Sequence, residues 1–382
     1  MLDAFDFFLV TMTLKAIGKD FGFSDAQATP AIAFSITITL AFRPVGAFLF
    51  GLLADRYGRR IPLMLDLVFY SIIEVLSGLA PNYTTFLILR ALFGIGMGAE
   101  WGVGASLAME KVPPRIRGLL SGFLQEGYAA GNLLAALVYA FVFPHWGWRP
   151  LFFIGGLPAL LAFFVRFRVK ESEVWQETKH ESWRHLGRAI TANTKLFLYL
   201  VALMTMMNFV SHGTQDLYPS FLSEERHLES SKAMITAISM IGAIIGGMVI
   251  GHLSDRIGRR KAIVIALLLA VAMIPLWIYA PNAALLAVGA FLMQFMVQGA
   301  WGVIPAHLSE LSPNSVRGFM PGFAYQCGVL LSSSVAYLEA LFGAPTNYGK
   351  PMALTAVTVF ILGAIVAAVG RENRGISFRS QS

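Results

Sequence analysis

One charged turn occurs twice in this sequence, at positions 200 residues apart. The segment 51–60 reads GLLADRYGRR, and it returns at 251–260 as GHLSDRIGRR. Each copy is flanked on both sides by an apolar segment long enough to cross a bilayer, which takes about 20 residues. A duplicated membrane protein accounts for this arrangement, because each half then needs the same tight hairpin between two membrane-spanning helices.

Composition places the chain among polytopic membrane proteins. Of its 382 residues, 56% are hydrophobic and 13% are charged, whereas ordinary globular domains carry about 25% charged residues. The net charge of +7 is explained by bases in short interhelical turns, so we expect no nucleic-acid partner. The sequence has one cysteine, Cys327, and no P-loop, nucleophile triad or Cys/His cluster. We therefore expect no enzyme, no catalytic residues, no metal and no cofactor.

Twelve segments are predicted to span the membrane. They imply an all-α membrane protein with two pseudo-symmetric six-helix bundles. Residues 1–167 form the N-terminal bundle, 168–192 a cytoplasmic linker, and 193–382 the C-terminal bundle with a short cytoplasmic tail. The predicted spans are 1–15, 28–53, 61–80, 84–110, 117–142, 148–167, 193–222, 230–253, 261–280, 284–308, 317–342 and 350–370.

Lysine and arginine concentrate in alternate loops of this arrangement. They follow the even-numbered spans and end the chain, whereas opposite loops such as 81–83 and 281–282 are short and poorer in bases. By the positive-inside rule, both termini lie in the cytoplasm. We expect a monomeric, multi-pass protein of the bacterial inner (cytoplasmic) membrane.

The repeat continues well beyond the charged turn. Residues 80–82, Trp101 and Glu110 recur at 280–282, Trp301 and Glu310, and halves duplicated in the same sense are typical of one large transporter class. The segments 51–60, 90–96 (RALFGIG) and 169–175 (VKESEVW) resemble signatures of the major facilitator superfamily. This resemblance covers essentially the whole chain and implies two bundles around a central cavity that opens alternately to either side.

The two charged turns predict a cytoplasmic gate. A carboxylate at such a turn can bind the N-terminus of a neighbouring helix, and an arginine can bind a carboxylate. Because the same charges recur at pseudo-equivalent sites, we favour a gate that stabilises the outward-open state over a solvated turn that only fixes topology. The gating residues are Asp55, Arg56, Arg59, Glu110 and Arg117 in the first half, and Asp255, Arg256, Arg259, Glu310 and Arg317 in the second.

Ionisable residues within spans are costly, by roughly 3 kcal/mol or more each, unless they are paired or face water. Arg43 and Arg90 lie deep enough to need a carboxylate from the protein or from a substrate. Asp66 and Glu74 belong to the third span, which the resemblance places at the periphery, so we expect lipid-interface or packing roles for them.

The seventh span carries the most unusual polar pattern. Asn208, His212 and Asp216 follow one another at four-residue spacing and share one face of a helix. Proton transfer suits the last two, because histidine titrates near neutrality and a neighbouring carboxylate tunes it. The alternative is a polar seam between helices.

This stripe resembles the signature Asn-x-x-Ser/Thr-His-x-Ser/Thr-Gln-Asp of the Jen-type lactate and pyruvate proton symporters, which are grouped with bacterial sialate and lactate symporters. The resemblance implies that Asn208, His212, Arg43 and Gln326 bind the substrate. The proton-coupling candidates are Asp216, His212, Asp3, Asp6 and Glu126. Asp3 and Asp6 are alternatively caps of a first helical turn, and Glu126 stands where relatives usually have glutamine.

The predicted function is import of a small monocarboxylate, lactate or pyruvate first, with a proton. The expected partners are a small organic acid, a proton and the lipid bilayer. Alternatives are a symporter for another acid (sialate, an aromatic acid or a dicarboxylate), a drug/proton antiporter, or a non-transporting sensor. The antiporter is disfavoured because the segment 127–132 lacks a Gly-Pro motif.

Overall fold

The computed structural model describes residues 2–157, 159–178, 183–333 and 348–378, and all regular elements in these ranges are helical. The first part of the chain forms α1 (Leu2–Asp20), α2 (Asp25–Tyr57), α3 (Arg60–Gly78), α4 (Tyr83–Lys111), α5 (Arg117–Gln125), α6 (Gly127–Trp146), α7 (Arg149–Ile154) and α8 (Ala159–Arg168). Two short helices follow, α9 (Glu173–Thr178) and α10 (Trp183–Ala192). The second part forms α11 (Thr194–Gln215), α12 (Tyr218–Ser220), α13 (Glu229–Ile257), α14 (Arg259–Ile278), α15 (Ala283–Leu311), α16 (Met320–Ser332) and α18 (Gly349–Val369).

Nine helical segments of the described chain are long and apolar enough to cross a membrane. The first, sixth and eleventh predicted spans correspond to α1, to α7 with α8, and to α16. Several predicted boundaries differ from the structure, for example at the end of α2, which is Tyr57 and not position 53. The helix α1 continues to Asp20 and not to position 15, the fifth span breaks at Glu126 between α5 and α6, and α16 starts at Met320. The end of the eleventh predicted span lies outside the described residues.

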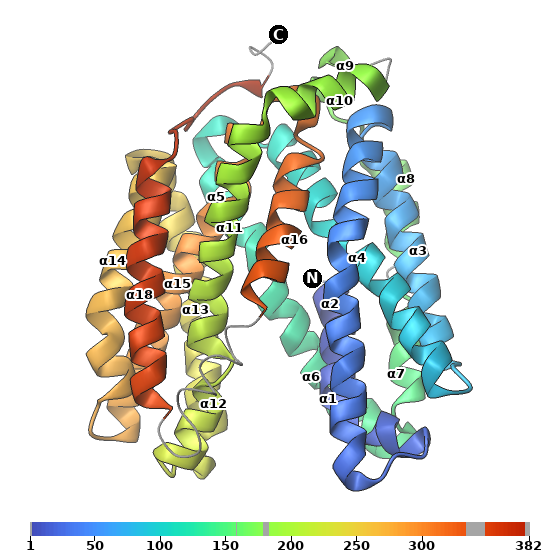
Figure 1. Cartoon of the computed structure of the whole chain (residues 1–382), viewed down its shortest axis with the longest axis vertical. Helices are drawn as coiled ribbons and strands as arrows, with labels where there is room; N and C mark the ends of the chain where they lie inside the picture. Colours follow the sequence, from blue (N-terminus) through green and yellow to red (C-terminus); the bar gives the residue numbers. More distant parts are fainter. Residues whose placement is uncertain (1, 158, 179–182, 334–347, 379–382) are drawn as a thin grey trace.

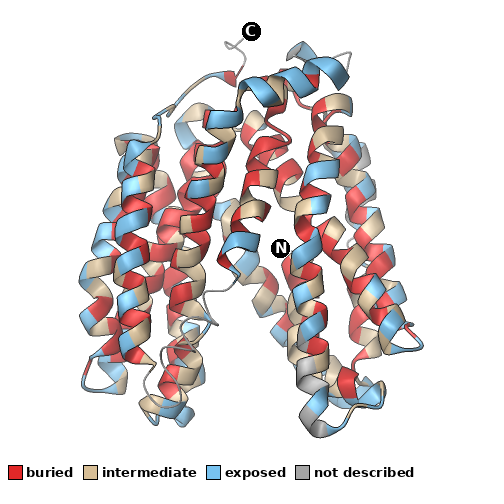
Figure 2. Cartoon of the chain, viewed as in Figure 1, coloured by how far each residue is buried: buried red, intermediate tan, exposed pale blue. Residues whose placement is uncertain are grey.

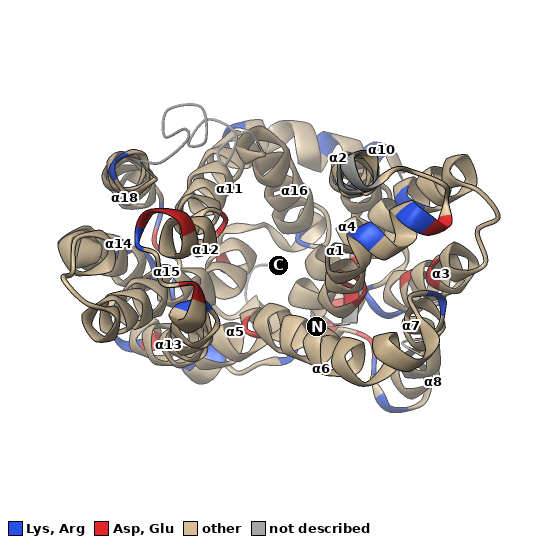
Figure 3. Cartoon of the chain, turned by 90° about the horizontal axis from the view of Figure 1, so that it is seen from below, with Lys and Arg blue, Asp and Glu red and all other residues tan. Residues whose placement is uncertain are grey.

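The helices gather in two groups that meet at one end (Figure 1). On one side lie α1–α4, α7 and α8, and on the other α11, α13–α15 and α18, while α9, α10 and the C-terminal segment cross the end where the groups meet. We call this end the closed end. Toward the opposite end the groups diverge, and from there α1, α2, α5, α6, α11 and α16 are seen around the centre (Figure 3).

Repeated residues build the turns of both groups in the same way. Asn82 and Asn282 cap α4 and α15, because each side-chain Oδ1 accepts a hydrogen bond from a backbone amide three residues later, at 2.9 Å. Gly58 and Gly258 adopt φ angles of 102° and 106° in the charged turns, a region that other residues enter only with strain. The repeat in the sequence therefore reflects identical hairpins.

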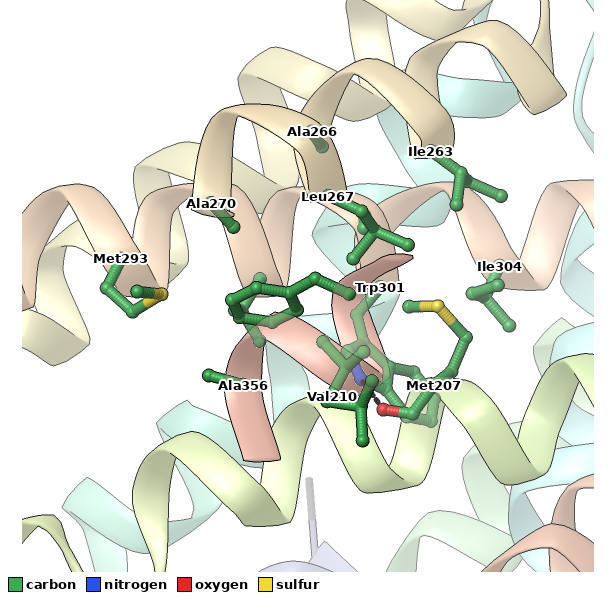
Figure 4. Close-up of a cluster of buried hydrophobic side chains, with 14 of the residues drawn as sticks. Met207, Val210, Ile263, Ala266, Leu267, Ala270, Met293, Trp301, Ile304 and Ala356 are labelled. Carbon is green, nitrogen blue, oxygen red and sulfur yellow. Dashed lines mark hydrogen bonds between the residues drawn. The ribbon is translucent and has the colours of Figure 1, made fainter. Parts of the chain in front are cut away.

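Buried and exposed residues both occur along the helices of each group (Figure 2), and many large apolar side chains are exposed to the expected lipid, among them Leu65 and Leu268. In the second group, Leu267 of α14, Met293 and Trp301 of α15, and Met207 and Val210 of α11 form one buried cluster (Figure 4). The indole of Trp301 donates a hydrogen bond to the Met207 carbonyl at 3.1 Å, which fixes the ring beside α11.

The third helix has the packing role, one of the two alternatives predicted for it. Asp66 is 1% exposed and Glu74 is fully buried, so neither faces lipid and the lipid-interface alternative is wrong. The reason is that α3 packs these side chains against α4. Arg90 of α4 donates to Glu74 at 2.5 Å and to Ser77 at 2.6 Å, so Arg90 obtains the carboxylate that its depth requires.

Candidate functional site

The carboxylate of Asp55 crosses from one helix group to the other at the closed end. Its Oδ1 accepts a hydrogen bond from the Gly318 amide at 2.8 Å, and its Oδ2 accepts one from the Phe319 amide at 2.9 Å. These amides precede α16, where N–H groups lack acceptors within the helix. Arg59 donates to Asp55 at 2.6 Å and to Glu110 at 3.1 Å. All three side chains are fully buried, so water does not screen this network.

Asp255 makes the same contacts in the opposite direction. It accepts hydrogen bonds from the amides of Gly118 (2.8 Å) and Leu119 (3.1 Å), which start α5. Arg259 donates to Asp255 at 2.8 Å and to Glu310 at 2.9 Å. Each group thus binds a helix start of the other group through one carboxylate, and the two contacts together hold the closed end.

The second arginines of the predicted gate differ from each other. Arg117 pairs with Glu310 at 2.9 Å. Arg317 donates to two backbone carbonyls at the end of α15, those of Ser309 and Ser312, each at 2.9 Å, and lies 3.7 Å from Glu110. Both guanidinium groups lie over the ring of Phe378, at 3.9 and 3.8 Å. A residue of the C-terminal segment therefore packs between arginines from the two halves.

The remaining two gate candidates lie at the rim of this network. Arg56 lies over the ring of Tyr57 at 5.5 Å, and Arg256 is exposed. At the centre of the first turn, burial opposes the charge of Arg59, but Glu110 and Asp55 outweigh it and raise the pKa of Arg59 above its ordinary value.

Sequence reasoning did not assign three residues of the closed end. Glu171 accepts hydrogen bonds from the amides of Arg59 (3.0 Å) and Arg60 (3.1 Å) at the start of α3. Glu372 does the same for the start of α14, at 3.2 and 2.9 Å. The two glutamates lie 201 positions apart, close to the 200-residue repeat, and this spacing was the sequence signal that could have identified both. Nothing in the sequence pattern singles out Phe378.

Arg43 of α2 lies beside α16, a helix that packs against α2. It is 7% exposed, its Nε has no hydrogen-bond partner among the described residues, and its guanidinium lies over the ring of Tyr325, at 5.7 Å. The Arg43 backbone lies tightly against Gly98 of α4, because a Cβ at Gly98 would come within 2.0 Å of the Arg43 carbonyl oxygen. Gln326 of α16 donates to the Gly98 carbonyl at 3.4 Å. The structure therefore brings Arg43 and Gln326 together.

The polar stripe of α11 divides into two parts. Gln215 donates to Gln294 of α15 at 2.8 Å, and Gln298 donates to Ser211 at 3.3 Å, so this part is the polar seam named as the alternative. His212 and Asp216 are different: Nδ1 of His212 lies 3.1 Å from Asp216 Oδ2, and the two side chains are 42% and 39% exposed. This pair is accessible to solvent.

Asn208 lies deeper than this pair and is buried. It donates a hydrogen bond to the Met204 carbonyl of its own helix at 2.7 Å. On α6, the ring of Tyr128 lies 5.2 Å from the ring of Phe8 on α1, measured between centroids.

The other proton-coupling candidates occupy separate environments. Asp6 is fully buried and neither carboxylate oxygen has a hydrogen-bond partner in the described chain, so it does not cap the start of α1. Asp3 lies in the first turn of α1, where the cap alternative stays open. Glu126, at the break between α5 and α6, is 8% exposed, and its Oε1 has no partner in the same ranges. It packs against Gly247 of α13.

Comparison with known proteins explains this arrangement. A family model described as Major Facilitator Superfamily matches residues 1–234, and one described as Sugar (and other) transporter matches residues 196–370. The chain belongs to the major facilitator superfamily. The predicted fold class, a membrane protein of two pseudo-symmetric helical bundles, is thereby confirmed. Members of this superfamily are transporters, so the chain is a multi-pass membrane transporter and not an enzyme.

Two curated bacterial relatives extend over nearly the whole chain. A sialic acid transporter of Escherichia coli (strain K12) is 29% identical over 98% of this chain and 92% of its own length. A probable 4-methylmuconolactone transporter of Cupriavidus pinatubonensis is 28% identical over 99% of this chain and 90% of its own. The solved structure of a proton:xylose symporter superimposes with a TM-score of 0.81 at 21% identity, over 100% of this chain and 95% of that one. This last likeness concerns the fold alone.

Proposed function

We propose that this transporter imports a small organic acid together with a proton. The observation that carries the proposal is Arg43, which is 7% exposed and whose Nε has no hydrogen-bond partner among the described residues. Its charge acts on Asp3 of α1, but no carboxylate of the described residues lies within ion-pair distance of its guanidinium. A buried charge without a partner is costly. A substrate carboxylate would supply the missing partner, and an arginine suits it because its planar fork binds carboxylates with two hydrogen bonds.

Residues around Arg43 support this assignment of the substrate site. Gln326 has a buried Oε1 without a hydrogen-bond partner in the described chain, and Asn208 and His212 come from the facing helix α11. We assign Arg43 to the carboxylate, and Asn208, Gln326 and His212 to hydrogen bonds with the rest of the acid. The acid would reach them from the end at which the helix groups diverge.

The proton would bind close to the same site. The solvent-accessible His212–Asp216 pair is the first candidate, because an imidazole beside a carboxylate can exchange protons with the solution. Asp6, Asp3 and Glu126 are further candidates, and the unpaired oxygens of Asp6 and Glu126 favour a neutral, protonated form in the present state. Import of an anion with a proton would then move no net charge.

Alternating access would follow from the two carboxylate contacts at the closed end. We propose that this end faces the cytoplasm with both termini, as the distribution of bases suggests, so that the structure represents an outward-open state. Residues 1–167 and 193–382 would then move as two bodies joined by the linker 168–192. The Asp55 and Asp255 contacts would break and re-form in each cycle.

The stripe of α11 favours lactate or pyruvate as the substrate, through the resemblance to Jen-type symporters. The two relatives, a sialic acid transporter and a probable 4-methylmuconolactone transporter, support a wider range of organic compounds. Lactate, pyruvate and sialate share a carboxylate that an arginine can bind.

Uptake into proteoliposomes tests the proposal. The purified protein is reconstituted, an inward proton gradient is imposed, and accumulation of labelled lactate, pyruvate, sialate and benzoate is measured. We expect at least one acid to accumulate with the gradient, and a protonophore or Arg43→Ala to abolish accumulation. Binding without gradient-driven uptake would indicate a sensor, and export of cationic drugs without acid uptake would indicate an antiporter. Either result would refute the proposal.

A further inference from the structure

An aromatic cluster adjoins the unpaired arginine. The ring of Tyr325 on α16 lies 4.6 Å from the ring of Trp101 on α4 and 5.7 Å from that of Trp301 on α15, measured between ring centroids. Trp101 and Trp301 are equivalent positions of the 200-residue repeat, but the equivalent of Tyr325 is Gln125. The tryptophans therefore belong to the duplicated frame, whereas the tyrosine between them is particular to the second half.

Hydrogen bonds hold both indoles in place. The Trp101 indole donates to the side-chain oxygen of Gln125 at 3.3 Å, and the Trp301 indole donates to the Met207 carbonyl at 3.1 Å. Trp301 is buried, whereas Trp101 and Tyr325 remain partly accessible. The accessible part of the cluster is thus an aromatic wall made by Trp101 of α4 and Tyr325 of α16, whose ring planes are inclined by 51°.

This wall lies beside the place that a substrate carboxylate would occupy. The Arg43 guanidinium lies over the Tyr325 ring, with Cζ 5.7 Å from the ring centroid. A carboxylate bound by both arms of a guanidinium shares its plane. If the carbon body of the acid is conjugated with the carboxylate, the body stays in this plane and is a flat group that can lie face-on against a neighbouring aromatic ring. A saturated carbon next to the carboxylate would instead turn the body out of the plane.

We propose that the acid transported by this protein has a flat, unsaturated body that lies against this wall, face-on to the ring of Tyr325 and inclined to the ring of Trp101. The inference rests on the proposed function, because it takes Arg43 as the group that binds the carboxylate. Pyruvate is planar and would fill a small part of the wall, whereas an aromatic or dienoic acid would cover more of it. Lactate, with its tetrahedral carbon, would make the poorest contact of these acids.

Benzoate and cyclohexanecarboxylate form a matched pair of probes, because they have the same number of carbons and the same charge but only one of them is flat. We expect the purified, full-length protein to bind benzoate about 2- to 10-fold more tightly, the range expected for one aromatic contact beyond burial of area. Tyr325→Leu should bring this ratio close to one. Tyr325→Phe, the matched control, should keep it, since the ring remains.

Titration calorimetry measures the ratio of the two dissociation constants, for benzoate and cyclohexanecarboxylate, in the wild type and in each variant. Thermal unfolding checks that each variant is folded. A ratio near one in the wild type, or an unchanged ratio in Tyr325→Leu, would overturn the inference. If Tyr325→Leu does not fold, Trp101→Leu takes its place, with the same expectation. Equal binding of both acids that Arg43→Ala abolishes would refute the aromatic subsite and leave the proposed function standing. Absence of binding by any acid would refute both.

Discussion

Replacing Asp55 by asparagine should open the closed end. The carboxylate has three partners: Arg59 at 2.6 Å, the Gly318 amide at 2.8 Å and the Phe319 amide at 2.9 Å. Asparagine keeps the shape and one acceptor oxygen, but it loses the charge and directs an NH2 group at a donor. The side chains of Asp55 and Arg59 are fully buried, so the loss is not reduced by solvent screening.

The size of the effect follows from this geometry. Removing one partner of a buried ion pair costs about 3–5 kcal/mol. The remaining amide oxygen of asparagine would recover one neutral hydrogen bond, about 1 kcal/mol, so a net loss of about 3 kcal/mol is expected. Since 1.4 kcal/mol corresponds to a factor of about ten, the population ratio of the closed-end state to the open-end state should fall roughly 100-fold.

Distance measurement between spin labels can detect this change. Ile61 and Lys261 are exposed, equivalent positions of α3 and α14 next to the charged turns, and labelled cysteines there would report the separation of the groups in a Cys327→Ser background. Asp55→Asn should add or enlarge a long-distance population. Asp20→Asn is the matched control, because its ion pair with Arg149 is about 40% exposed and lies outside this end. Identical distance distributions in Asp55→Asn and the wild type would show that the contact does not hold the closed end.

Three further predictions concern the buried and accessible carboxylates. Asp216→Asn should retain acid binding but lose accumulation driven by a proton gradient, which parallel binding and uptake assays would separate; full accumulation would remove Asp216 from proton coupling. Glu126→Gln mimics the neutral form, so binding should become less dependent on pH, and an unchanged pH profile of the dissociation constant would exclude Glu126. Glu74→Gln leaves Arg90 without its ion-pair partner, which costs about 3 kcal/mol or more. The midpoint of thermal unfolding in detergent should therefore fall by several degrees, and an unchanged midpoint would contradict the importance of this pair.

The turns between helices were predictable because the same sequence motif occurs in both halves of the chain. Each half needs an asparagine that caps a helix, Asn82 or Asn282, and a glycine with positive φ, Gly58 or Gly258. These are local requirements, so the repeated sequence directly predicts repeated hairpins. The same holds for Asp55, whose contact with a helix start follows from its place beside the turn.

Properties that depend on how helices face one another were less accessible to sequence reasoning. The sequence of the third span does not show which helix lies opposite it, so lipid-interface and packing roles both stayed open for Glu74, which pairs with Arg90 inside the group. The seam between Gln215 and Gln294 and the packing of Phe378 between two arginines join residues far apart in the chain. Only the folded structure brings such residues together.

The carboxylates at the closed end bind main-chain amides, and this has a consequence for how the protein can evolve. A side-chain partner disappears with a single substitution, whereas a backbone N–H is supplied by every residue except proline. The second amide in each contact comes from Leu119 in one half and Phe319 in the other, so this position has diverged without loss of the hydrogen bond. The first is glycine in both halves, and a Cβ at Gly318 would come within 2.8 Å of the Asp55 carboxylate. Amino-acid substitution is therefore tolerated at Leu119 and Phe319 and restricted at the neighbouring Gly118 and Gly318.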